Sequence, residues 1–222
     1  MRALAERFAN YCEENLDMEF ADSYKYKSLS VCLLDCVYSL RARYITTTIP
    51  VVERYATAFM NGNRYAAGDT VSMLTNNIEN VGGPIAFAYK ILKNQQKIGG
   101  KNAIPKSEVC YQLAKHLKYL QIETIEDFRD FGCQESLEIA IRSVKGIGDA
   151  GTNYLFMFAG DPDRCKSDVH IHRFVRVACG RSVTNEECQE LFAEAVELLR
   201  DKWQGLTVRQ LDSMIWKKYS QK

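Results

Sequence analysis

Two glycines and an aspartate are the residues of this chain whose types and spacing are best suited to chemistry. Gly146 and Gly148 lie in the segment VKGIGDAGTN, and Asp168 follows twenty residues after the second glycine. Glycines leave backbone N–H groups unobstructed, and such groups, together with the N-terminus of a following helix, bind phosphate oxygens. The pattern therefore predicts a phosphate-binding turn and a carboxylate held at a fixed distance from it.

Both features also have a purely structural explanation. Any tight connection between helices favours glycine, and an aspartate in the context KSDVH is typical of a helix N-cap. The residues after the second glycine favour the phosphate site, because Ala150 and Gly151 permit close approach and Asp149 can cap the next helix. A carboxylate at a helix N-terminus is stabilised in the ionised form, which can stabilise positive charge developing on a sugar. Two roles, helix cap and catalytic carboxylate, therefore stay open for Asp168.

Helices must position these residues, since the apolar periodicity is helical almost throughout the chain. Thr124 with Asp127 and Thr184 with Glu187 are typical N-terminal capping pairs, and Ser107 is expected to cap the helix that follows it. The expected helices cover residues 29–40, 49–59, 71–74, 84–92, 108–120, a short stretch after 124, 154–159, 169–178, 184–200 and 207–218. Residues 98–102 are expected to form a loop. The predicted fold class is all-α.

The composition is that of a globular protein without a membrane span. The 222 residues are 46% hydrophobic and 26% charged, and no apolar run approaches the roughly 20 residues that cross a bilayer. The first residues, MRALAER, include an acid and lack the apolar stretch of a signal peptide. We therefore expect a cytoplasmic protein, nucleoid-associated if the source is bacterial, with no membrane partner.

The charge is nearly neutral overall and uneven locally. A net charge of +1 gives no global indication of nucleic-acid binding, since dedicated binders are often strongly basic. Residues 90–118, however, contain seven lysines and the single acid Glu108. A basic face that contacts phosphate and a solvated lysine-rich loop explain this pattern equally well.

The eight cysteines do not have the spacing of a metal site. None forms a Cys-x-x-Cys pair, and no compact cluster of four lies near the C-terminus. In a cytoplasmic chain, scattered cysteines are usually small buried hydrophobic residues. We therefore expect neither zinc nor an iron–sulfur cluster, and no other cofactor.

The string VKGIG-(x)19-DVHIHR, residues 144–173, resembles the helix-hairpin-helix, Gly-Pro-Asp (HhH-GPD) superfamily of DNA glycosylases. Endonuclease III and the adenine and thymine mismatch glycosylases belong to this superfamily. Residues 33–42 look like its early helix and wedge loop, and residues 211–216 look like its terminal helix. The resemblance thus covers most of the chain from about residue 28 to 218, although only the hairpin with its aspartate is specific.

The resemblance implies two helical lobes with the substrate cleft between them. Residues 28–160 would form the lobe that carries the hairpin, and residues 1–27 and 161–222 would pack together as the other lobe. The protein would bind double-stranded DNA as a monomer and flip a base out of the duplex, with Asp168 as the catalytic carboxylate. The residues expected to contact DNA are Arg41, Lys145, Gly146, Ile147, Gly148, Ala150 and Gly151.

Other candidate residues have weaker support. Arg41 aligns with the wedge that fills the space of the flipped base, but an exposed arginine at a helix end is an equally good explanation. Tyr44, Tyr154 and His170 are candidate pocket or backbone contacts, although aromatic residues at helical spacing more often belong to a core.

Two departures restrict the reaction that the resemblance implies, a missing lysine and the missing iron–sulfur cluster, and in both the chain is similar to the thymine mismatch glycosylases. Members that cleave the DNA strand have a lysine at the position of Ala150, and without that amine no Schiff base can form. Lys145 and Lys166 lie nearby in sequence but not at this position. Asp149 replaces a basic residue that is common after the second glycine, which should weaken non-specific DNA affinity. The sequence therefore predicts a monofunctional glycosylase without lyase activity.

The excised base stays open at this point. Thymine or uracil opposite guanine is the first expectation, and an alkylated purine or a modified cytosine, including one in foreign (phage) DNA, is an alternative. A catalytically silent HhH DNA-binding protein and a helical interaction protein are rival interpretations from other classes. A silent module has no need for an aspartate in register with the hairpin.

Overall fold

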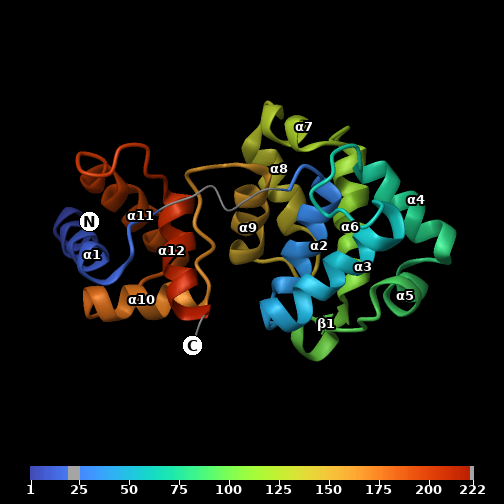
Figure 1. Ribbon diagram of the computed structural model, residues 1–222, viewed down its shortest axis with the longest axis horizontal. Coiled ribbons are helices and arrows are strands. Elements are labelled where there is room, and N and C mark those ends of the chain that lie inside the picture. Colours follow the sequence, from blue (N-terminus) through green and yellow to red (C-terminus); the bar gives the residue numbers. More distant parts are fainter. Residues whose placement is uncertain (20–25, 221–222) are drawn as a thin grey trace. The chain divides into compact units, whose positions relative to one another are not determined.

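The computed structural model describes residues 1–19 and 26–220 of the chain, and helices account for most of them (Figure 1). The described residues form twelve α-helices, a few short π- and 3-10-helical turns and one sheet of two short strands. The prediction of an all-α protein is confirmed. Of the segment 1–27 assigned to the second lobe, residues 20–25 lie outside the described residues.

The chain divides into two compact units. One, here called the terminal unit, consists of Met1–Tyr24 and Gly160–Lys222, and the other, the central unit, consists of Lys25–Ala159. Each unit has to be understood from its own packing.

The central unit is organised around α2, Leu29–Ser39, all of whose residues are buried. Ser28 caps this helix by accepting a hydrogen bond from the Val31 amide, and α2 packs against α3, α6 and α9. The remaining helices of the unit are α3 (Ile49–Phe59), α4 (Val71–Val81), α5 (Pro84–Phe87), α6 (Lys106–Tyr119), α7 (Ile125–Asp130), α8 (Gln134–Arg142) and α9 (Asp149–Ala159).

Several expected helix boundaries in this unit need correction. The helix expected at 71–74 continues to Val81, because Ile78 extends the buried stripe of Val71 and Leu74. The helix expected at 84–92 is divided into α5 and a π-helical turn, Ala88–Leu92. A second π-helical turn, Tyr44–Thr48, precedes α3.

The expected loop at 98–102 is a small β-hairpin. Strand β1, Lys97–Ile98, pairs antiparallel with β2, Ile104–Pro105, around the 3-10 turn Gly100–Asn102. The Lys106 amide donates to the Gln96 carbonyl at 2.9 Å, so α6 begins directly after the strand pair. Pro105 therefore occupies the N-cap position, and the expectation that Ser107 caps this helix is wrong.

In its described residues, the terminal unit is an assembly of helices from both chain ends. Its helices are α1 (Arg2–Asn15), α10 (Val169–Cys179), α11 (Asn185–Leu199) and α12 (Val208–Ser220). Phe8 of α1 meets Phe174 of α10 and Phe192 of α11, with ring centroids 5.9 and 5.1 Å apart. The capping box of Thr184 and Glu187 at α11 is confirmed, as is that of Thr124 and Asp127 at α7.

Within the described part of the chain, no helix combines the length and the apolar character needed to cross a membrane.

Candidate functional site

The predicted hairpin is the connection between α8 and α9. Six residues, 143–148, separate the two helices, and we call them the hairpin turn. The Ile147 amide donates to the Val144 carbonyl at 3.1 Å, and the Gly148 carbonyl accepts from the Thr152 amide at 2.9 Å. The turn is therefore closed by its own backbone, and Gly148 leads directly into the first turn of α9.

The two glycines of the turn have different reasons to be glycine. Gly146 has a φ of +97°, and a Cβ built there would lie 2.8 Å from the Ile98 side chain. Gly148 lies outside the left-handed region, and an added Cβ would meet nothing within 4 Å. The expectation of unusual backbone dihedrals thus holds for Gly146 only. Gly148 instead leaves open, exposed space at the start of α9.

The small residues after the turn serve the packing of α9 as well as access to its N-terminus. Gly151 is buried, and a Cβ added to it would meet the side chains of Ile147 and Leu40 at 3.4 Å. Ile147 is itself buried, whereas Ala150 is half-buried. The side chain of Ile147 and the Cα of Gly151 therefore lie on the packed side of the turn.

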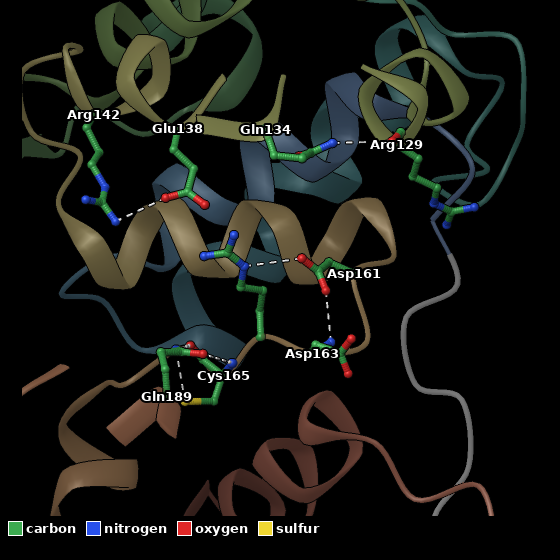
Figure 2. A network of polar contacts seen from close by, with 9 residues as sticks. Arg129, Gln134, Glu138, Arg142, Asp161, Asp163, Cys165 and Gln189 are labelled. Atoms are coloured by element: carbon green, nitrogen blue, oxygen red, sulfur yellow. Dashed lines mark hydrogen bonds and ion pairs between the residues drawn. The ribbon is translucent and has the colours of Figure 1, made fainter. Parts of the chain in front are cut away.

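The charges around the turn are mixed. Lys145 is exposed, and its Cε lies 4.0 Å from the position of a Cβ added to Gly99. Asp149 forms an ion pair with Arg142 at 3.4 Å. Arg142 also pairs with Glu138 at 3.4 Å, and Figure 2 draws this second contact. Asp149 is the first residue of α9, and its ion pair with Arg142 places a carboxylate beside the exposed turn.

The lysine-rich segment is not uniform. Six of its seven lysines are exposed, but Lys106 is 2% exposed. Its Nζ donates to the carbonyls of Tyr38 at 3.0 Å and Leu40 at 2.8 Å, and to Gln96 Oε1 at 3.0 Å. Burial lowers the pKa of Lys106 to about 8. This lysine holds the C-terminus of α2, a role that the sequence analysis missed.

Arg41 follows the end of α2 held by Lys106. It is exposed and has a φ of +53°, a left-handed conformation that is uncommon for a residue with a side chain. Such outliers persist only where the surroundings stabilise them, and the bonds from Lys106 to the carbonyls of Tyr38 and Leu40 provide that support. The position suits both interpretations of Arg41, the wedge and the exposed helix-end arginine.

Tyr44 and Tyr154 are engaged in the packing of the central unit. The Tyr44 hydroxyl donates to Oδ2 of the fully buried Asp35 at 2.8 Å, as does the Tyr26 hydroxyl. Burial and the charge of Asp35 raise the pKa of Tyr44 far above its usual range. Tyr154 is 8% exposed, with its ring centroid 4.3 Å from that of Phe158. Both tyrosines thus have the contacts of core residues.

Asp168 is the N-cap of α10. Its Oδ1 accepts hydrogen bonds from the backbone amides of His170 at 2.8 Å and Ile171 at 3.2 Å, and the residue is half-buried. The structural role that the sequence left open is therefore present. His170 Nδ1 is buried with no hydrogen-bond partner among the described residues, and its ring lies 6.2 Å from that of Tyr219.

Two helices hold the segment that leads into Asp168. We call residues 165–168 the cap loop. Gln189 of α11 accepts from the Cys165 amide at 3.2 Å and donates to the Cys165 carbonyl at 2.5 Å and Ser167 Oγ at 3.3 Å (Figure 2 draws Gln189 beside Cys165). Asp212 of α12 accepts from the Lys166 amide at 3.0 Å.

Asp212 is the functional candidate that sequence reasoning did not find. It is 4% exposed, and burial together with the negative charge of Asp168 raises its pKa to about 7. Its sequence signal was an aspartate at a position next to Leu211 and close to Met214 and Ile215, all buried. A carboxylate in such an apolar stripe has a specific partner or function.

The cysteines are all free. Seven are buried, as expected, but Cys133 is exposed, with its Sγ 3.0 Å from Ser136 Oγ at the start of α8. Across residues 1–19 and 26–220, no group of three or more His, Cys, Asp or Glu side chains comes together to hold a metal ion.

Comparison with other proteins gives one match. No curated protein and no solved structure matches the chain. One family model matches residues 3–220, nearly the entire length, and its description is "Domain of unknown function (DUF8548)". The chain therefore belongs to the DUF8548 family.

Proposed function

We propose that this protein is a monofunctional DNA glycosylase of the HhH-GPD type. The observation that carries the proposal is the combination of two features at a spacing of twenty residues. One is the hairpin turn that joins α8 to α9, with a left-handed Gly146 and an exposed Gly148. The other is a half-buried carboxylate, Asp168, at the N-terminus of α10.

In this proposal the hairpin turn binds the DNA backbone. The N-terminus of α9 offers backbone N–H groups and the positive end of a helix dipole, which suit a phosphate oxygen and read no sequence. The exposed Gly148 leaves room for a phosphate, and Ile147, Ala150 and Gly151 contribute through their main chain. Lys145 adds a positive charge beside the turn, whereas Asp149 opposes binding.

The catalytic step assigned to Asp168 is stabilisation of a positive charge. As the N-glycosidic bond of a flipped nucleotide breaks, the sugar acquires oxocarbenium character, and a nearby carboxylate lowers the energy of that state. The base leaves with the electrons of the N-glycosidic bond, water adds at the sugar carbon, and the proton that the water loses balances the proton that the released base takes up. Arg41 is the residue that would occupy the vacated place in the duplex.

The reaction stops at base removal. The side chain at position 150 is a methyl group on α9, so no amine stands where lyase-competent enzymes form their Schiff base. The proposed substrates are thymine or uracil opposite guanine, with an alkylated purine or a modified cytosine in foreign DNA as alternatives. The proposed state is a monomer that needs no cofactor.

One observation favours the rival function, a catalytically silent HhH DNA-binding protein. The carboxylate of Asp168 accepts two backbone amides, which is a sufficient structural reason for an aspartate at this position. Both proposals include DNA binding, so only a test of chemistry at Asp168 distinguishes them.

The test is base release from a panel of duplexes that each contain one modified or mispaired base, with alkali added to cleave abasic sites. Asp168→Asn keeps an N-cap oxygen but removes the charge, so it separates the two roles. We expect release by the wild type and a loss on the order of a hundredfold or more in Asp168→Asn. No release by the wild type, or equal release by this variant, would contradict the enzymatic proposal.

The absence of lyase activity has its own measurement. Without alkali, the wild type should leave the strand intact, and borohydride should trap no covalent complex between protein and DNA. A nicked strand or a trapped complex would contradict the monofunctional assignment.

A further inference from the structure

The hydrogen bond between Asp212 and the Lys166 amide holds a buried carboxylate against the backbone, at a point two residues before Asp168. A carboxylate inside a protein is costly unless it is hydrogen-bonded or protonated. Asp212 lies among the buried residues of α12, and its Oδ2 accepts the Lys166 amide at 3.0 Å. The bond fixes the backbone that leads into α10.

Gln189 fixes the same backbone from another helix. Its side-chain amide makes both hydrogen bonds of the Cys165 main chain, accepting from the N–H and donating to the carbonyl, and also reaches Ser167 Oγ. Three consecutive residues, Cys165, Lys166 and Ser167, are therefore held by side chains of α11 and α12 rather than by regular secondary structure.

This external support matters because the cap loop is strained. Ser167 has a φ of +49°, in the left-handed region that residues with a Cβ rarely adopt, and it is 4% exposed. Such a conformation persists only when the surroundings over-determine it, and strain of this kind is concentrated at functional sites. Ser167 immediately precedes Asp168, so its φ and ψ set the direction in which the Asp168 side chain leaves the backbone.

We propose that Asp212 and Gln189 are positioning residues that hold the strained cap loop and thereby aim the carboxylate of Asp168. The kinetic consequence of this positioning rests on the proposed glycosylase function, whereas its structural consequence does not. Neither residue is assigned a contact with DNA. Asp212 acts through a hydrogen-bond acceptor, which an asparagine also supplies and an alanine lacks.

The negative charge of Asp168 is one of the causes of the raised pKa of Asp212, after burial. The causes of the raised pKa of Asp212 are burial and Asp168, opposed by the Lys166 amide and the Lys166 charge. The Cys165 thiol is a further titratable group that interacts with Asp212. Because Ser167 directly precedes Asp168, a shift in the cap loop would move the carboxylate that the proposed chemistry uses.

The structural test is amide hydrogen exchange by NMR on the full chain. Asp212→Ala should speed exchange of the Lys166 amide, and of the His170 and Ile171 amides that Asp168 caps, by about tenfold or more, because the loop opens locally. Asp212→Asn should keep all three close to the wild type. Gln189→Ala, a milder change at a half-buried site, should speed exchange at Cys165 and provides a second variant if Asp212→Ala does not fold.

A matched control is Asp69 of the central unit. It is 6% exposed and accepts hydrogen bonds from Ser28 and Tyr55, so Asp69→Ala removes a carboxylate of similar burial. This variant should leave the exchange rates of Lys166, His170 and Ile171 unchanged. If Asp212→Ala also leaves them unchanged, or if Asp212→Asn speeds them as much as Asp212→Ala does, the positioning proposal is overturned.

The kinetic test compares single-turnover base release with DNA affinity. Misplacement of a reacting group by about 1 Å costs on the order of a hundredfold in rate, so Asp212→Ala should release base about tenfold to a hundredfold more slowly at unchanged affinity. Asp212→Asn should recover most of the rate. A wild type that releases no base would overturn the glycosylase function, and the exchange rates would still decide on positioning.

Discussion

The hairpin turn and the cap loop both present candidate groups at the start of a helix, yet they are held in opposite ways. The hairpin turn is closed by its own backbone, through the bond from Ile147 to Val144, and its left-handed residue is a glycine. The cap loop has a serine in the left-handed conformation and is fixed by side chains of α11 and α12. A turn that binds phosphate needs only accessible backbone N–H groups, whereas a catalytic carboxylate needs a side chain held in one orientation.

The comparison predicts that the cap loop is sensitive to residues far away in sequence. The largest expected effect is the pH dependence caused by Asp212. Its pKa rises from an ordinary unfolded value near 4 to about 7 in the fold, so the folded state keeps its proton while the unfolded chain loses it. The free energy of unfolding should therefore fall as the pH rises through this window, by up to about 4 kcal/mol.

Asp212→Asn should remove this loss, because the amide does not titrate. Urea unfolding at pH 8 should show the variant to be more stable than the wild type, and the difference should vanish below about pH 3, where the wild-type carboxyl is protonated in both states. A difference between the two proteins that is the same above and below this titration window would contradict the assigned burial of this carboxylate.

The hairpin turn should instead be sensitive to its own residues. Gly146→Ala introduces a side chain at φ +97°, only 2.8 Å from Ile98 Cγ2, and should destabilise the fold by on the order of 3 kcal/mol. Gly148→Ala is the matched control, since its Cβ meets nothing, and should cost about 1 kcal/mol or less. Equal losses of thermal stability in the two variants would contradict the different roles of the glycines.

Two variants of Asp168 separate its structural role as a helix N-cap from its proposed chemical role. Asp168→Ala removes the acceptor of the His170 and Ile171 amides and should destabilise the fold by about 1 kcal/mol. Asp168→Asn should cost only a few tenths of that amount, since asparagine is an equally good N-cap. Denaturant midpoints of both variants measure this directly. A large loss in Asp168→Asn would show that the carboxylate charge itself stabilises the fold.

The smallest effect on stability is expected at the charged rim of the hairpin turn. The Asp149–Arg142 pair is exposed, so Asp149→Asn should change stability by about 0.5 kcal/mol or less. The same change removes a negative charge next to the proposed phosphate site, and DNA affinity at low salt should increase. Fluorescence anisotropy across a salt series measures this affinity, and an affinity that decreases would contradict a phosphate site at the hairpin turn.

Much of the helical framework could be predicted because it is encoded locally. The capping pairs at Thr124 and Thr184 lie within three residues of their partners, and the apolar stripe of α2 is visible in the sequence. Ser107 was misassigned because the start of α6 depends on Gln96 and the β-hairpin, ten residues upstream. The helix expected at 71–74 was too short because polar residues interrupt the stripe that Ile78 continues.

In the candidate site, too, residues with local signals could be predicted and residues with distant partners could not. Gly146 was identified because a left-handed turn has a residue type that only glycine satisfies without strain. Lys106 was counted among surface lysines because its three acceptors lie at the C-terminal end of α2 and just before β1, which no local pattern reveals. Asp212 was overlooked because its partner, the Lys166 amide, is 46 residues away.

The sequence by itself determined the all-α class, the glycine turn between α8 and α9 and the N-cap at Asp168, because each depends on interactions within a few residues. Only the tertiary structure decided that Lys106 is buried at the end of α2, that Gly151 serves helix packing and that Gln189 and Asp212 hold the cap loop. The physical reason is that burial and hydrogen bonding between distant segments arise from packing, which brings together side chains that the linear order keeps apart.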